Sequence, residues 1–425
     1  MTAAHRIALV SVLALLGACQ SESGDPDLGT ADLGGSRDLG GLRDDGVPPT
    51  DGPATDAPPT DGGTPATGPA LISLAAGYNA SCAVLTDGTA RCWGDNRTGT
   101  LGDGTTTSSV RPVTVSGLTD ATAISTGYEF SCALRTGGTV MCWGSGTNGH
   151  LGNGSTTDSL VPVAVSGLTG VSEIRVGFTT ACALKDDGTV WCWGRGGELG
   201  STVLTESSVP VQVPGLANVM HLANASHGGT SLSTHTCGVR TDGTAFCWGL
   251  NSDGQNGTGN QDITRTPAEV MGVDDATAIT AGMTHACAVR ATGTDCWGSS
   301  QLIGDGSVER RLVPTRVMTS TVFTQLTSGF EHTCGLTAGG DVWCWGRNGS
   351  GQIGDGLPLT VSDVRLAPVQ ADVANVALLA AGMTHTCAHT SAGVTYCWGR
   401  NEYGEIGSGT PGSGVRSSVP SVVVW

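Results

Sequence analysis

The tripeptide Cys-Trp-Gly ends seven similar stretches of this chain, and their regular spacing limits the possible folds more than any other feature. The cysteines of the seven copies are Cys92, Cys142, Cys192, Cys247, Cys296, Cys344 and Cys397, at intervals of 50, 50, 55, 49, 48 and 53 residues. A period of this size is typical of repeat proteins, in which one unit cannot bury its apolar face without a neighbour. The 425 residues therefore indicate one array of seven units rather than several unrelated domains.

Each unit has the pattern of four short strands separated by turns. In the second unit we expect them at residues 123–127, 131–135, 139–143 and 162–165. The 67 glycines and the low content of charged residues, 13%, fit a β protein with many turns. Seven such units predict an all-β, seven-bladed β-propeller with four-stranded blades. A solenoid is the alternative, but it needs distinct capping units, and the last copy is as regular as the middle ones.

Residues 1–18 have the pattern of an export signal. An apolar run from Ile7 to Leu16 follows Arg6, and it is too short to span a membrane as a helix. The sequence Leu16-Gly17-Ala18-Cys19 resembles the lipobox of bacterial lipoproteins, in which the cysteine is acylated and becomes the mature N-terminus. This resemblance implies a lipid anchor on Cys19 and a location in the bacterial cell envelope, on the periplasmic or the outer surface of what we expect to be the outer membrane. An ordinary cleaved signal with an incidental cysteine is the other interpretation.

Residues 19–70 consist of this cysteine and a segment rich in Asp, Gly, Pro and Thr, without any aromatic residue. Ten acidic residues against Arg37 and Arg43 give residues 20–70 a charge of −8, and such a segment cannot bury enough apolar surface to fold. We expect a disordered tether there and the propeller at residues 71–425. The whole chain has a net charge of −17 and only one lysine, Lys185, which argues against nucleic acid and anionic lipid headgroups as partners.

Fourteen of the fifteen cysteines form seven regular pairs, and Cys19 stands alone. In six units the partners are ten residues apart: Cys82/Cys92, Cys132/Cys142, Cys182/Cys192, Cys237/Cys247, Cys334/Cys344 and Cys387/Cys397. A three-residue turn with a left-handed glycine, as at Asp87-Gly88, would set such cysteines opposite each other in the non-hydrogen-bonded position, where side chains lie closest. We therefore predict cross-strand disulfides, with reduced packing cysteines as the alternative; zinc sites use more closely spaced cysteines. Cys287 and Cys296 are nine residues apart, so their pairing needs a different turn or a bulge.

Three sequence patterns carry a family resemblance. They are Gly282-x-x-His285 followed by Cys287-Ala288-Val289, then Asp187-Gly188-Thr189-Val190-Trp191-x-Trp193-Gly194, then Gly351-Gln352-Ile353-Gly354-Asp355-Gly356. They resemble the regulator-of-chromosome-condensation repeat, in all seven copies from Leu71 to Trp425. The resemblance implies a seven-bladed β-propeller, with blades that can be offset from the sequence repeats and with the two chain ends closing one blade together. Functions in this family range from nucleotide exchange on a small GTPase to light sensing and β-lactamase inhibition, so the fold alone does not decide function.

The repeated tryptophans and histidines each have a structural and a functional interpretation. The tryptophan of each unit, such as Trp143, is expected to pack between blades with its indole N–H bonded to the backbone; a ligand-binding ring of tryptophans is the alternative. Four histidines share one position, two residues before a cysteine: His235, His285, His332 and His385. We expect hydrogen-bonded structural histidines, because a catalytic or metal cluster would require all four to converge on the central axis.

Positions that break the repeat are the better functional candidates, because the scaffold does not dictate them. They are residues 224–233 with His227, and the loops 95–109, 195–208, 347–363 and 400–417, the last with Glu402, Tyr403 and Glu405. We expect the loops to collect on one rim and to form a recognition surface; variable loops without a role are the other interpretation. The sequence contains no nucleophile elbow, phosphate-binding glycine loop, zinc-protease helix or paired-carboxylate site.

The sequence therefore predicts a monomeric, non-enzymatic scaffold that binds a protein or glycan partner at the cell envelope. No catalytic residue, cofactor or metal ion is expected. The alternative is an envelope hydrolase or lyase that uses rim or axial residues, since catalysis in a propeller can come from scattered loop positions.

Overall fold

The computed structural model describes residues 67–196, 199–225, 235–360, 362–410 and 416–425. The chain divides into two units, Met1–Gly62 and Gly63–Trp425, and all described residues belong to the second. The predicted signal peptide, Cys19 and nearly all of the predicted tether lie outside the described residues. Within the described residues, no helix is both long enough and apolar enough to span a bilayer.

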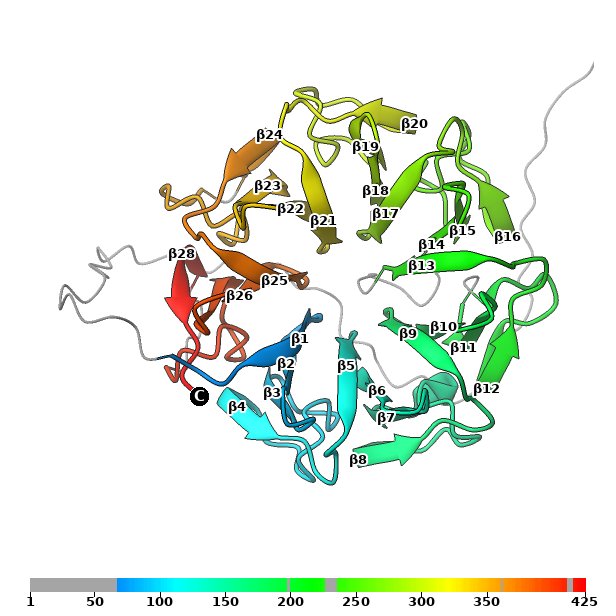
Figure 1. Ribbon diagram of the computed structural model, residues 1–425, viewed down its shortest axis with the longest axis vertical. Helices are drawn as coiled ribbons and strands as arrows, with labels where there is room; N and C mark the ends of the chain where they lie inside the picture. The colour runs from blue at the N-terminus through cyan, green and yellow to red at the C-terminus, as the bar shows by residue number, and fades with distance from the viewer. Residues whose placement is uncertain (1–66, 197–198, 226–234, 361, 411–415) are drawn as a thin grey trace, which may run out of the picture. The chain divides into compact units, whose positions relative to one another are not determined.

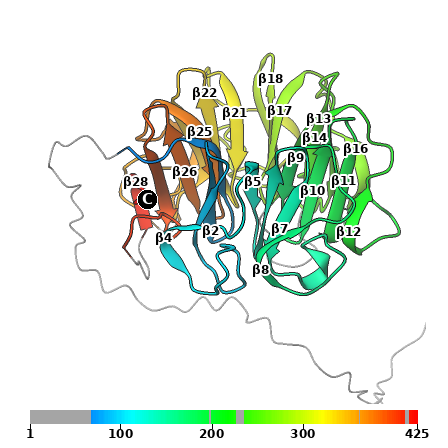
Figure 2. The same cartoon turned by 60° about the horizontal axis from the view of Figure 1, so that its bottom comes forward.

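The described residues form seven antiparallel sheets of four strands, arranged around a central axis as the blades of a propeller (Figure 1). The strands of each sheet are consecutive in the chain, from β1–β4 in the first blade to β25–β28 in the last. Figure 2 shows the blades from the side, where the strands run between the two faces of the propeller. The predicted fold class is confirmed.

The four strands of each blade run in order from the central axis to the outer edge of the propeller. The innermost strands are β1 (Leu71–Ala76), β5 (Ala121–Thr126), β9 (Val171–Val176), β13 (Val219–Asn224), β17 (Ala276–Ala281), β21 (Phe323–Ser328) and β25 (Val376–Ala381). The second strands are β2 (Ala80–Leu85), β6 (Phe130–Arg135), β10 (Thr180–Lys185), β14 (His235–Arg240), β18 (His285–Arg290), β22 (His332–Thr337) and β26 (His385–Thr390). The third strands are β3 (Ala90–Gly94), β7 (Val140–Gly144), β11 (Val190–Arg195), β15 (Ala245–Gly249), β19 (Gly293–Gly298), β23 (Val342–Arg347) and β27 (Thr395–Arg400). The outer strands are β4 (Ser109–Thr114), β8 (Ser159–Ala164), β12 (Glu206–Gln212), β16 (Thr264–Glu269), β20 (Arg311–Arg316), β24 (Val364–Gln370) and β28 (Arg416–Val422), and a short 3-10 helix, η1 (Thr147–Gly149), follows β7.

The hairpin between the second and third strands has the predicted turn. In the first blade Leu85 N donates to Thr89 O at 2.9 Å, and Gly88 has a φ of +79°, the left-handed conformation that favours glycine. Cys82 then lies opposite Cys92, and the two are joined by a disulfide with a Cα–Cα distance of 4.1 Å.

All seven cysteine pairs form such disulfides, with Cα–Cα distances of 4.0 or 4.1 Å. In the fifth blade Arg290 pairs with Gly293 across a shorter turn, which removes one residue and still sets Cys287 opposite Cys296. A different turn, rather than a bulge, therefore accounts for the spacing of nine.

The hydrophobic core is divided among the seven seams between blades. Each seam has one cluster of buried side chains, which combines the disulfide of one blade with the tryptophan of the next. Between the first two blades, for example, Cys82 and Cys92 pack with Trp143, and all three are fully buried. Burying a side chain of this size contributes about 2–3 kcal/mol at each seam.

Five of the seven repeated indole N–H groups bond to the backbone, as predicted, whereas the buried Nε1 of Trp345 has no hydrogen-bond partner within the described residues. Those of Trp93, Trp143, Trp193, Trp297 and Trp398 donate to main-chain carbonyl oxygens of the neighbouring blade at 2.8–3.0 Å. The repeated tryptophans are therefore part of the scaffold, and they present no exposed ring to a ligand.

The ring closes without exchange of a strand between the chain ends. The expectation that the two ends share a blade is wrong, because β25 to β28 all come from the last repeat, which is long enough to supply four strands. The closing seam uses the contacts of the other seams: Met383 N donates to Gly77 O at 2.8 Å, and Trp93 Nε1 donates to Glu405 O at 2.8 Å. These bonds make the first and last blades neighbours in the same way as any other two.

Every outer strand contains a proline: Pro112, Pro162, Pro210, Pro267, Pro314, Pro368 and Pro420. Proline has no N–H to offer to another strand, so these edges are poor templates for pairing with a second chain.

Candidate functional site

The predicted recognition loops start on one face of the propeller. They follow the third strands, which end on the side where the innermost strands end, and backbone hydrogen bonds tie them to the turns of their own blades. Asp95 N donates to Asn79 O at 2.8 Å, and Arg347 N donates to Glu331 O at 2.8 Å. We call this side the loop face. Of residues 224–233, only 224 and 225 belong to the described part, and His227 lies outside it.

Large apolar side chains occupy one position in six of the turns on the loop face. The position follows the glycine after the innermost strand, and its residues are Tyr78, Tyr128, Phe178, Met283, Phe330 and Met383, all half-buried. Backbone hydrogen bonds link these turns around the axis; for example, Tyr78 N donates to Gly127 O at 2.9 Å. The mouth of the propeller is thus lined by aromatic and methionine side chains.

In the first three blades these side chains contact one another and form an aromatic patch, which we define as Tyr78, Tyr128, Phe178, Arg97 and Tyr403. The ring centroids of Tyr78 and Tyr128 are 4.6 Å apart at 85°, and those of Tyr128 and Phe178 are 4.4 Å apart at 26°. The guanidinium of Arg97 lies 4.9 Å from the ring centroid of Tyr403, which comes from the loop of the last blade. Burial raises the pKa values of Tyr78 and Tyr128, so both phenols stay neutral and can donate a hydrogen bond.

Arg97 is held in position by Asp95. The guanidinium Nη2 lies 2.6 Å from Asp95 Oδ2, and Nε lies 3.0 Å from Oδ1, which is a two-pronged ion pair. This hydrogen bond with Asp95 raises the pKa of Arg97. The arginine therefore keeps its positive charge, which Asp95 balances, and it is held in place with its outer side exposed beside Tyr403.

A cavity of about 180 Å³ opens beside the patch at the seam between the first two blades. We call it the seam cavity; it is lined by Asn79, Asp95, Arg97, Thr98, Thr100, Tyr128 and Glu129. Burial raises the pKa of the Glu129 carboxyl, and the charges of Asp158 and Asp95 act in the same direction against the opposing effect of Arg97. The cavity combines an aromatic wall with carboxyl, amide and hydroxyl groups.

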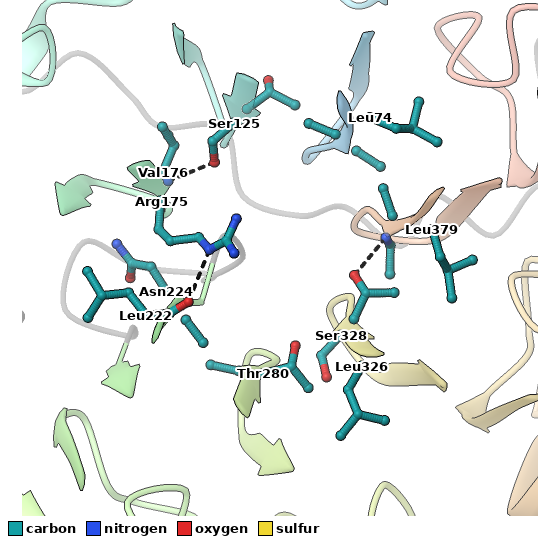
Figure 3. A pocket seen from close by; sticks show the side chains of 18 of the residues that line it. Leu74, Ser125, Arg175, Val176, Leu222, Asn224, Thr280, Leu326, Ser328 and Leu379 are labelled. Atoms are coloured by element: carbon teal, nitrogen blue, oxygen red, sulfur yellow. Dashed lines mark hydrogen bonds between the residues drawn. The ribbon is translucent and has the colours of Figure 1, made fainter. Parts of the chain in front are cut away.

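The innermost strands enclose a central channel, also of about 180 Å³ (Figure 3). Its wall is largely occupied by hydrogen bonds between blades: Ser125 Oγ accepts from Val176 N at 2.9 Å, and Arg175 Nε donates to Leu222 O at 3.0 Å. Arg175 is the one charged side chain among the described residues that line it, and it is paired with Glu173 at 2.6 Å. No acid–base group in the described part of the channel faces a second one across the axis.

The four repeated histidines do not converge on the axis. They are fully buried in the second strands, and three of them bond to a hydroxyl group of the next blade: His285 Nε2 to Thr333 Oγ1 at 2.7 Å, His332 Nε2 to Thr386 Oγ1 at 3.0 Å and His385 Nε2 to Ser81 Oγ at 2.9 Å. These are the structural histidines that the repeat pattern indicated.

The fourth, His235, has no hydrogen-bond partner within the described residues. Ala286 stands where the next blade would offer the hydroxyl group. Burial lowers the pKa of His235 to about 3, so the ring is neutral at physiological pH. Within the described residues no group of three or more His, Cys, Asp or Glu side chains is arranged to hold a metal ion.

Comparison with known proteins identifies the repeat. Two family models of the regulator of chromosome condensation (RCC1) repeat match the chain, one at residues 71–100, 121–149, 171–198 and 323–352, the other at residues 87–134, 137–184, 242–289 and 339–389. Together these matches cover more than half of the sequence. The chain belongs to the RCC1-repeat family. The RCC1-type propeller is a scaffold and binding fold, and this chain has that architecture.

Similar proteins within the RCC1-repeat family are diverse. The ultraviolet-B receptor UVR8 of Arabidopsis thaliana is 28% identical over 186 residues, which are 42% of this chain and 42% of the receptor. Protein RCC2 of Mus musculus is 37% identical over 82 residues, 19% of this chain and 16% of that protein. The matched part of the chain thus spans less than half the length of these curated relatives.

Solved RCC1-type structures share the fold. Prp20p of Saccharomyces cerevisiae superposes with a TM-score of 0.68 at 22% identity, over 84% of this chain and 87% of that one, and its binding properties to Gsp1p and histones have been studied. Human WBSCR16 superposes with a TM-score of 0.66 at 21% identity, over 75% of this chain and 86% of that one.

The aromatic patch was only partly found from the RCC1-type repeat pattern. Tyr403 and the loop with Arg97 were among the candidates, but Tyr78, Tyr128 and Phe178 were not. A signal was present, because the chain has only 4 tyrosines and 5 phenylalanines, and four of these nine share one repeat position.

Proposed function

We propose that this protein is a lipid-anchored, non-enzymatic RCC1-type propeller that binds a protein or glycan partner at the bacterial cell envelope. The observation that carries the proposal is the aromatic patch on the loop face. Tyrosine and arginine dominate the energetics of protein interfaces, and here neighbouring packing and an ion pair hold them in fixed positions before any partner arrives. The binding of Gsp1p and histones by Prp20p supports a protein partner for the same fold.

The anchor and the location rest on the sequence alone. Cys19 in the sequence Leu16-Gly17-Ala18-Cys19 would carry the acyl chains, and the acidic segment after it would separate the propeller from the membrane. Seven fully buried disulfides suit an oxidising compartment outside the cytosol.

A pull-down from envelope extracts tests the proposed function. The full chain should capture the same partner in repeated trials, and Tyr128→Ala and Tyr403→Ala should each reduce the capture at least about tenfold, as hot-spot side chains do. Met318→Ala is the matched control, because Met318 is an exposed apolar residue in the β20–β21 connection, away from the loop face. Equal capture by all three variants, or none by the unmodified chain, would overturn the proposal.

The alternative function is an envelope hydrolase or lyase. Two carboxyl groups, Asp95 and Glu129, line one cavity, which is the observation in its favour. Asp95 is already bound by Arg97 through both of its oxygen atoms, which leaves Glu129 as the one carboxyl group available for proton transfer. Turnover of a glycan or peptide substrate by the purified chain, abolished by Glu129→Gln, would favour the enzyme over the scaffold.

A further inference from the structure

We infer that the seam cavity binds a primary ammonium group, and that the partner of the proposed function supplies it as a lysine side chain. The inference rests on that function, and it adds the chemical feature by which the partner is recognised. Three independent observations support it: a glutamate without its cation, a buried amide oxygen without a donor, and an aromatic wall.

The glutamate lacks the cation that another blade provides at the same repeat position. Glu331 corresponds to Glu129, and its Oε2 lies 3.2 Å from Nε of Arg347 in the same blade. In the second blade the residue corresponding to Arg347 is Ser145, and Glu129 forms no ion pair within the described residues. A half-buried carboxylate without a counter-ion is unfavourable, so a cation entering the cavity would remove that cost.

Asn79 provides the second observation. It lines the seam cavity and is only 6% exposed, and its Oδ1 is buried without a hydrogen-bond partner among the described residues. A buried acceptor left without a donor costs about 1–3 kcal/mol, so such atoms are normally satisfied by the protein, by water or by a ligand. An ammonium group has three donors, which the carboxylate of Glu129, the amide of Asn79 and the hydroxyl groups of the threonines could accept.

The surroundings favour a cation over an anion. The ring of Tyr128 forms part of the wall, and an ammonium group within about 6 Å of such a ring centroid is attracted to its face. Arg97 also lines the cavity, but its guanidinium is already paired with Asp95 and lies over the ring of Tyr403. Two carboxylates and one guanidinium leave the cavity with a charge of −1, and the chain as a whole is at −17.

The size of the cavity limits the ligand. At about 180 Å³ it is smaller than the roughly 300–1,000 Å³ of pockets that enclose drug-sized ligands. It can therefore take one side chain rather than a whole sugar or nucleotide.

NMR titration of the full chain with model amines tests the inference. The probe is Nα-acetyl-lysine methylamide, and the control ligand is the same molecule with its side-chain amine acetylated. The charged probe should shift the backbone amide resonances of Thr98 and Glu129, and the neutral one should not. Equal shifts with both ligands, or none with the charged probe, would contradict the inference.

Probe binding by three variants tests whether the ammonium group binds in the seam cavity rather than elsewhere on the loop face. Glu129→Gln should weaken binding of the charged probe about tenfold or more, because a charged hydrogen-bond acceptor is lost. Ser145→Arg should weaken probe binding to a similar extent. The new guanidinium would pair with Glu129, as Arg347 pairs with Glu331 in the sixth blade. Glu331→Gln is the matched control and should leave probe binding unchanged.

The same variants distinguish failure of the inference from failure of the proposed function. Acetylation of lysines in the envelope extract should abolish capture of the partner if its lysine enters the cavity. Capture that survives both acetylation and Glu129→Gln, but is lost in Tyr128→Ala, would refute the lysine inference and leave the binding function intact.

Discussion

Glu405→Gln should make the propeller more stable at neutral and alkaline pH. The side chain of Glu405 is 0% exposed at the seam between the last and the first blade. Its Oε2 accepts a hydrogen bond from Tyr403 N at 2.8 Å, and its Oε1 has no partner in the described part of the chain. Gln255 and Gln352 occupy the same position in two other blades and accept the equivalent backbone hydrogen bond at 2.9 Å. A neutral amide therefore fits this position.

The magnitude follows from the pKa of Glu405. Burial, the largest cause, raises it from 4.5 to about 7, so the folded protein keeps the proton over a range in which the unfolded chain has lost it. The group thus reduces stability progressively as the pH rises from 4.5 to about 7. At 1.36 kcal/mol per pKa unit, the full cost above pH 7 is about 3 kcal/mol. The glutamine variant does not bear this cost.

Urea unfolding at pH 4, 6 and 8 measures the effect. The difference in unfolding free energy between variant and unmodified chain should be near zero at pH 4 and should grow to about 3 kcal/mol at pH 8. Using the difference cancels the opposite contribution of His150 and His285, whose pKa values are lowered by burial to about 4. Gln352→Glu should introduce the same pH dependence into a seam that lacks it. If the curves for Glu405→Gln and the unmodified chain run parallel at all three pH values, the buried-carboxyl argument is wrong.

Three further substitutions test the scaffold and the anchor. Ala286→Ser should stabilise the protein by about 1 kcal/mol, because a hydroxyl group there can bond to His235 as Ser81 bonds to His385; no change in the urea midpoint would contradict this. Replacing Cys132 and Cys142 together by alanine should cost about 3 kcal/mol in the same assay, the chain-entropy value for a loop of this length, and a loss well under 1 kcal/mol would show that the disulfide constrains little. Cys19→Ala should move the protein from the membrane fraction to the soluble fraction, and an unchanged distribution would exclude the lipid anchor.

The fold could be predicted from the sequence because its determinants recur in every unit. Cys132, Cys142, Trp143 and the turn glycine form one local unit, and a period near 50 residues with four strands allows few closed arrangements. How the ring closes could not be predicted. The same repeat pattern is compatible with a last blade shared by the two chain ends and with a last blade built from the last repeat alone. What decides it is whether the last repeat supplies its own outer strand, and β28 does so at the very end of the chain.

The site was less predictable, because its parts come from different units. Tyr128 and Phe178 are one repeat apart, while Arg97 and Tyr403 come from opposite ends of the propeller sequence and meet only because the ring closes. The seam cavity depends on a substitution, Ser145 in place of an arginine, which is visible only when one blade is compared with another. Loop spacing pointed to the face that carries the aromatic patch, but not to the residues of the patch.

The histidine position divides the ring into two parts, and this division links the scaffold to the site. In the last four blades the residue two positions before the first cysteine of the disulfide is a histidine. Three of these histidines bond to the next blade. In the first three blades the same position holds Ala80, Phe130 and Thr180, so no histidine bond crosses those seams. Across the first two of these seams, the aromatic side chains at the loop face pack against one another instead. The aromatic patch therefore has two roles, since it joins the first three blades to one another and also presents the surface that we propose for the partner.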